Sequence, residues 1–164
     1  MVYAKCLEDY FNKNRYQLYR RTKLDSTANK NFLTWTQNDF EDEIEQSYKK
    51  TIENESLLKK MQLSYYESIF DYLVLEKFKD ENLFEYLLTE NINHYKSKVY
   101  INTGNQKEYL EVKQVFLGDS EKFRFLNLDF IKEAELKKVL SFYQKLEEKK
   151  SLEKQFNRIK FCND

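Results

Sequence analysis

Apolar residues recur every three to four positions through the first half of the chain, which is the spacing of amphipathic helices. One helix is predicted from about Val2 to Arg21, with an inward stripe made of Tyr3, Leu7, Tyr10, Phe11 and Leu18. A polar loop at 24–31 follows. Thr36 as the cap and Asp39 in the first turn then predict the start of a second helix. Its helical face consists of Phe40, Ile44, Ser47, Tyr48 and Thr51.

Two further helices are predicted between residues 56 and 95. The third, at about 56–78, is apolar over a wide arc, which is typical of a central helix. Its two stripes are Leu58, Met61, Tyr65, Ile69 and Tyr72, and beside them Tyr66, Phe70 and Leu73. Asp80 is expected to cap a fourth helix at about 81–95. The chain has two Gly and no Pro, so long helices are permitted almost everywhere.

The hydrophobic period changes after Ser97. The segments KVYIN, KEYLEVKQVFL and FRFLNL alternate as strands do, so a three-stranded antiparallel meander is expected at about 98–128. Asp129 is expected to cap a long final helix that reaches about residue 159, and its last part, about 147–164, is expected to project or fray. The predicted fold is α+β and predominantly helical, with about five helices and the meander in a single domain spanning 1–164.

The charge of the chain is balanced overall but unevenly distributed. Lys and Arg number 28, as do Asp and Glu, which argues against a protein built mainly to coat nucleic acid. Residues 1–35 hold seven basic and three acidic side chains, residues 36–92 hold six and fourteen, and residues 93–164 hold fifteen and eleven. An acidic block therefore separates two mildly basic ones, an asymmetry that can steer a partner.

The cysteines and the amino-acid composition indicate the cellular compartment of the protein and the type of genome that encodes it. Cys6 and Cys162 have no framework spacing, and the first residues lack the apolar core of a signal peptide. Free thiols and a cytoplasmic location, which includes the cytoplasm of a host cell, are therefore expected. The chain is rich in Lys, Asn, Ile, Tyr and Phe and poor in Gly, Ala and Pro, which indicates an AT-rich genome of a low-GC bacterium, a virus, a phage or a mobile element.

Few enzymatic chemistries fit the sequence. His94 is the only histidine and is expected to be a solvated or capping residue, so two-histidine metal sites are excluded. With two glycines there is no Gly-rich nucleotide-binding loop. Glu111 and Lys113 form an E-x-K pattern on an expected strand, the arrangement of metal-dependent nucleases, but the preceding strand lacks the acidic residue that the pattern needs. The pair also fits the outer face of a half-exposed strand.

The acidic run at 39–45 is a second candidate for metal binding. Its carboxylates could hold a divalent cation, but carboxylates in the first turns of a helix usually compensate the helix dipole. We therefore expect no metal and no cofactor. The residues of this run are Asp39, Glu41, Asp42, Glu43 and Glu45.

The segment NRYQLYRRTK, at 14–23, is the strongest candidate for a binding surface. On a helical wheel of about 100° per residue, Tyr16 lies about 180° and Tyr19 about 120° from Leu7, on the side expected to be polar. Exposed tyrosine and arginine are enriched in the hot spots of protein interfaces and also form stacking platforms for single-stranded nucleic acid. The predicted partner-binding residues are Arg15, Tyr16, Tyr19, Arg20 and Lys23.

Three functions remain open at the level of sequence. The first is a small non-enzymatic binding protein, an inhibitor or adaptor that occupies a surface on a host protein or nucleoprotein complex, with no membrane partner. The second is a nucleic-acid-binding protein that uses the basic, aromatic first helix. The third is a metal-dependent nuclease that uses Glu111 and Lys113.

Overall fold

The computed structural model describes residues 1–21, 31–69, 81–99, 110, 113–114, 116–118 and 120–147. Within these ranges every regular element is helical, and none of the helices has both the length and the apolar character needed to cross a bilayer. The chain divides into two compact units, Met1–Leu87 and Leu88–Asp164. The single-domain assignment stays a prediction, because two compact units can still unfold in one cooperative transition.

The first unit begins with helix α1 (Val2–Tyr19). Its buried side chains are Ala4, Leu7, Phe11 and Leu18, which follow the helical spacing expected from the sequence. The prediction is wrong for Tyr3, which is 56% exposed, while the small side chain of Ala4 takes the buried place beside it. Tyr10 is half-buried and stacks on Phe40 with ring centroids 5.6 Å apart.

Helix α2 (Gln37–Thr51) starts where the sequence predicts. The Thr36 side chain accepts from the backbone N–H of Asp39, and the Asp39 carboxylate accepts from the backbone N–H of Thr36 at 2.9 Å. This reciprocal capping box satisfies two of the N–H groups that a helix start leaves open. The predicted inward face is confirmed for Phe40, Ile44, Ser47 and Tyr48.

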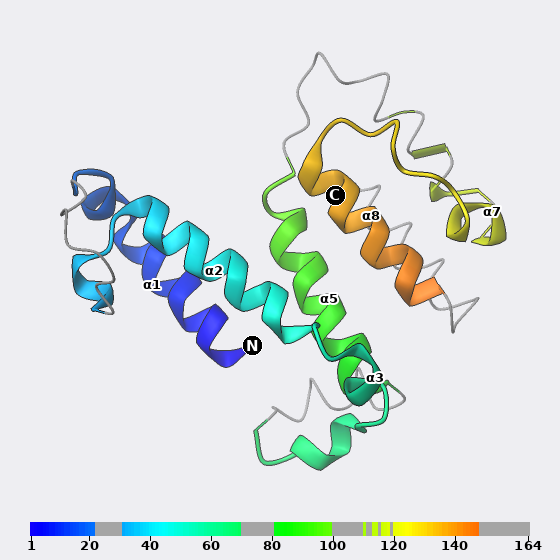
Figure 1. Cartoon of the computed structure of the whole chain (residues 1–164), viewed down its shortest axis with the longest axis horizontal. Coiled ribbons are helices and arrows are strands. Elements are labelled where there is room, and N and C mark those ends of the chain that lie inside the picture. The colour runs from blue at the N-terminus through cyan, green and yellow to red at the C-terminus, as the bar shows by residue number, and fades with distance from the viewer. Residues whose placement is uncertain are drawn as a thin grey trace. The chain divides into compact units, whose positions relative to one another are not determined.

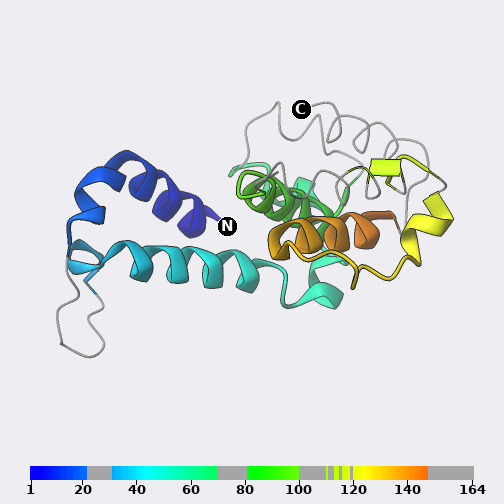
Figure 2. The same cartoon turned by 90° about the horizontal axis from the view of Figure 1, so that it is seen from above.

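Helices α1 and α2 form an antiparallel hairpin (Figures 1 and 2). Phe40, in the first turn of α2, is fully buried, and Phe11 and Trp35 pack around it. Trp35 follows the short 3₁₀ helix η1 (Phe32–Thr34). The hydroxyl of Tyr48 donates to the carboxylate of Glu8 at 2.6 Å, which ties the two helices together with a polar contact.

The long third helix predicted at 56–78 is wrong in its described part. The chain instead forms α3 (Glu55–Leu58) and the 3₁₀ turn η2 (Leu63–Tyr66), separated by residues 59–62, the last of which, Gln62, is extended. Gln62 pairs with Asn82 in an antiparallel bridge, and Leu63 is buried with Tyr86 and Leu87. This tertiary pairing overrides the helical propensity, and residues 70–78 of the predicted helix lie outside the described part.

The fourth predicted helix is present as α5 (Leu83–Lys96). Asp80, predicted as its cap, lies outside the described residues. Asn82 fills the role instead, since its side-chain oxygen accepts from the Glu85 N–H while the Glu85 carboxylate accepts from the Asn82 N–H, each at 3.0 Å. Helix α5 is continuous across the division between the units: Tyr86 and Leu87 belong to a core cluster of the first, and Ile92 and Tyr95 to one of the second.

The predicted β-meander is wrong, and with it the α+β fold class. Within the described part of 98–128 there is no strand: Leu110, Lys113, Gln114 and Phe116 are helical, and α7 (Ser120–Arg124) occupies the start of the expected third strand. Phe116 and Phe123 are buried in one cluster, although they lie in separate helical segments. Short apolar runs satisfy both periods, and tertiary burial here selects the helix. Most of the first expected strand lies outside the described residues.

Helix α8 (Ala134–Glu147) begins later than predicted. Asp129 does not cap it; the carboxylate of Glu133 accepts from the N–H of Leu136, and Asp129 pairs with Lys137 at 2.7 Å. Its buried side chains are Leu136, Val139, Leu140 and Glu147. The predicted extension of this helix to about residue 159, and the projecting segment after 147, lie outside the described residues.

Candidate partner-binding site

The Tyr–Arg surface, defined as Arg15, Tyr16, Tyr19 and Arg20, lies on the last turns of α1. Tyr16 is 72% exposed and Tyr19 is 79% exposed, and both arginines are also exposed. The expected exposure of both tyrosines is therefore confirmed, and Leu18 between them is completely buried. Lys23, predicted to belong to the same surface, lies outside the described residues.

Tyr16 and Arg20 are already joined to each other. The guanidinium carbon of Arg20 lies 4.6 Å from the centroid of the Tyr16 ring, and Arg20 Nη2 also donates to the Tyr16 hydroxyl. These residues are one helical turn apart, where side chains meet on a helix surface. The pairing restricts two long side chains, so a partner that binds them has less rotamer entropy to remove.

The end of α1 is rich in positive charge, and the nearest carboxylate on its own helix is Asp9, one turn before Lys13. The segment 10–21 contains four basic residues and no carboxylate. One of the four, Arg21, has a structural role, because its Nη1 donates to the backbone oxygen of Trp35 at 3.1 Å and holds the end of the helix against the segment that follows η1. The other three basic residues of this segment are exposed: Lys13, Arg15 and Arg20.

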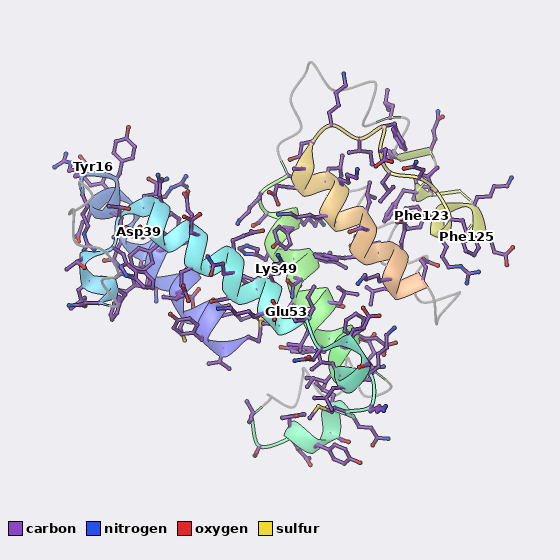
Figure 3. The ribbon with its side chains drawn as sticks, in the orientation of Figure 1. Tyr16, Asp39, Lys49, Glu53, Phe123 and Phe125 are labelled. Atoms are coloured by element: carbon purple, nitrogen blue, oxygen red, sulfur yellow. The ribbon has the colours of Figure 1, made fainter. Side chains whose placement is uncertain are left out.

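The acidic run at 39–45 lies at the start of α2, at the same end of the hairpin as Tyr16 (Figure 3). Asp39 belongs to the capping box, and the Glu41 carboxylate accepts from the side chain of Gln37 at 2.8 Å. The carboxylate of Glu43 accepts from the hydroxyl of Tyr3; burial first, and this charge second, raise the pKa of Tyr3. Within the described ranges no three metal-ligating side chains are grouped for a cation.

The other sequence candidates are His94, the Glu111–Lys113 pair and the two cysteines. His94 is buried in the last turn of α5, edge-on to Tyr95 with ring centroids 5.0 Å apart, so the expectation of a solvated histidine is wrong. Lys113 is helical and Glu111 lies outside the described residues, so the expected E-x-K strand is wrong as well. Cys6 is an exposed free thiol, as predicted, and Cys162 lies outside the described residues.

One surface feature escaped the sequence reasoning. A pocket in the second unit is lined by Arg124, Phe125, Ser141, Gln144 and Lys145. Arg124 and Phe125 fell within the expected third strand, where Phe125 was one alternating apolar residue among several. The available signal was the spacing of Ser141, Gln144 and Lys145, which places three polar side chains on one face of α8.

Comparison with known proteins adds no relative: no family model, curated protein or solved structure matches the chain.

Proposed function

We propose that the protein is a non-enzymatic binding protein that occupies a surface on another protein or nucleoprotein complex, as an inhibitor or adaptor. The observation that carries the proposal is the pair of tyrosines that stand 72% and 79% exposed beside two exposed arginines. Tyrosine and arginine are enriched among the residues that dominate binding energy in protein interfaces. The AT-rich composition supports an origin in a low-GC bacterium, a virus, a phage or a mobile element, and for the last three the partner would be a host component.

The partner surface that fits is acidic and contains an apolar depression. Lys13, Arg15 and Arg20 give the end of α1 a positive potential, which accelerates encounter with a negatively charged surface. Tyr16 and Tyr19 supply large rings that lose little rotamer freedom on binding. The rings would enter the depression, while the arginines pair with Asp or Glu side chains at its edge.

A protein fits this end of the hairpin better than a nucleic acid does. Tyr16 lies at the same end as Asp39 (Figure 3), and the exposed carboxylates of Glu41 and Asp42 follow within one turn. Carboxylates close to the binding surface repel a phosphate backbone, whereas a protein partner can place its own cations opposite them.

The test compares three forms of the full chain, each immobilised and exposed to a lysate of a low-GC bacterium, once untreated and once treated with nuclease. Tyr16→Ala with Arg20→Ala removes the paired side chains. Tyr65→Ala is the matched control, because Tyr65 is the same residue type and is also 72% exposed, but lies on η2. We expect the wild type and the control to capture the same protein and the double variant to lose it, with an affinity lower by about 30-fold or more.

The outcome separates the alternatives. Equal capture by the double variant and the wild type contradicts the proposal, and so does equal loss in the Tyr65→Ala control. Capture that disappears when the lysate is treated with nuclease indicates the nucleic-acid alternative, which then also shows a steep fall of affinity with salt.

A further inference from the structure

The pocket in the second unit combines features that the Tyr–Arg surface lacks. Its volume is about 640 Å³, within the range of roughly 300–1,000 Å³ that is typical of ligand pockets. The walls come from the end of α7 and from one face of α8, two helices that pack against each other. The pocket offers one aromatic ring, two cationic side chains and two uncharged polar side chains.

Phe125 provides a flat apolar face at this pocket. Its ring is 77% exposed, whereas Phe123, two residues earlier, is buried in the core (Figure 3). The guanidinium carbon of Arg124 lies 4.5 Å from the centroid of the Phe125 ring. This contact orients the ring and leaves its opposite face open to a second flat group, as in proteins that stack bases on aromatic side chains.

The polar side chains are fixed by hydrogen bonds that leave defined groups for a ligand. The amide nitrogen of Gln144 donates to the backbone oxygens of Phe123 and Leu126, at 2.8 and 2.9 Å, and so holds the α7 segment on α8. Both N–H groups of that amide are then used, and its carbonyl oxygen remains as an acceptor. Ser141 donates its hydroxyl proton to the Lys138 carbonyl and keeps acceptor lone pairs.

We propose that this pocket binds one nucleotide of a single-stranded nucleic acid. The base stacks on Phe125, the phosphate contacts Arg124 and Lys145, and the Gln144 carbonyl oxygen accepts a hydrogen bond from the base. The two cationic side chains fit an anionic phosphate, and the exposed ring fits a planar base. A simple anion would contact the cations but would make no use of the ring. The proposal is independent of the protein-binding function assigned to α1.

The test measures binding of the full chain to fluorescent oligothymidylate and oligouridylate of about 15 nucleotides, a length that covers one small binding site. Phe125→Leu keeps an apolar side chain but removes the ring. Lys145→Gln removes one pocket charge. Lys122→Gln is the control for charge, because Lys122 is an exposed lysine on α7 that does not line the pocket. Circular dichroism verifies that each variant is folded, as expected for exposed positions.

We expect the wild type to bind at least one of the two strands and to bind it more tightly than duplex DNA. Phe125→Leu should weaken binding by about five- to 150-fold, which is the range for loss of one stacked base. Lys145→Gln should reduce the slope of log affinity against log salt by about 0.7, the value for one phosphate contact on a single strand. Preference for oligothymidylate or oligouridylate assigns the ligand as DNA or RNA.

Any one of the following results overturns the proposal. The first is no binding of either strand at low salt. The second is an equal effect of Lys122→Gln and Lys145→Gln, which indicates diffuse electrostatic attraction. The third is unchanged affinity in Phe125→Leu, or binding of a phosphotyrosine peptide in place of both strands.

Discussion

Loss of the Tyr16–Arg20 pair should change stability far less than loss of the buried residue between them. Leu18 is 0% exposed, and truncation of such a leucine to alanine costs about 2–5 kcal/mol. For a chain of this size, about 1 kcal/mol shifts the melting temperature by roughly 2–4 °C, so Leu18→Ala should lower it by roughly 4–20 °C.

The double change Tyr16→Ala with Arg20→Ala removes an exposed cation–π contact worth about 0.5–1 kcal/mol. Alanine has a higher helix propensity than tyrosine or arginine, and this difference offsets several tenths of a kcal/mol of the lost stability. The net loss should therefore be about 0.5 kcal/mol or less, which corresponds to about 2 °C or less.

The assay is thermal unfolding followed by circular dichroism for the wild type, the double variant and Leu18→Ala at one protein concentration. If the double variant loses as much stability as Leu18→Ala, then the Tyr–Arg surface is covered by the chain itself. Its residues would then be ordinary packing, and the proposed binding function would lose its support.

The remaining predictions concern a helix start and a surface carboxylate. Thr36→Ala should lower the free energy of unfolding by about 1 kcal/mol, measured in urea, because it opens the capping box of α2; no loss would show that the reciprocal hydrogen bonds do not contribute. The hydrogen bond from Lys137, followed by the one from Asn127, holds the pKa of Asp129 below its ordinary value of 3.8. The stabilisation is present above that value and is lost as pH falls through the lower folded-state pKa. NMR titration of the carboxyl group should show this depressed pKa, and Lys137→Met should reverse most of it; an unchanged pKa in that variant would contradict the assignment.

Capping residues and helical spacing predicted the structure correctly where tertiary packing favours the same conformation. Thr36 and Asp39 mark the start of α2, and Leu7, Phe11 and Leu18 mark the buried face of α1, because capping and helical spacing are properties of adjacent residues. Tyr3 lies within the predicted stripe by helical spacing, yet it is exposed, whereas the adjacent Ala4 is buried. Helical spacing along the sequence cannot predict how much space a neighbouring helix leaves for a side chain.

The larger errors arose where partners distant in sequence decide the conformation. Gln62 is extended because Asn82, twenty residues later, pairs with it. Phe123 belongs to a helix because Phe116 and Leu140 share its core cluster, although the FRFLNL alternation alone favours a strand. The exposure of Tyr16 and Tyr19 could be predicted from one helical wheel, but the pocket beside Phe125 could not. Its walls come from two helices whose contact depends on Gln144.

Helix α5 makes the two units energetically dependent on each other, because one continuous helix supplies buried side chains to both. If α5 unwinds, Tyr86 and Leu87 are exposed from the first unit, and Ile92 and Tyr95 from the second. The local opening reactions that include this helix therefore carry the cost of both cores, and its amide hydrogens should be among the slowest to exchange. A ligand that binds only the closed form of either unit also suppresses these openings. Binding at one site can thus favour binding at the other through a shared unfolding equilibrium, without any change in the folded conformation.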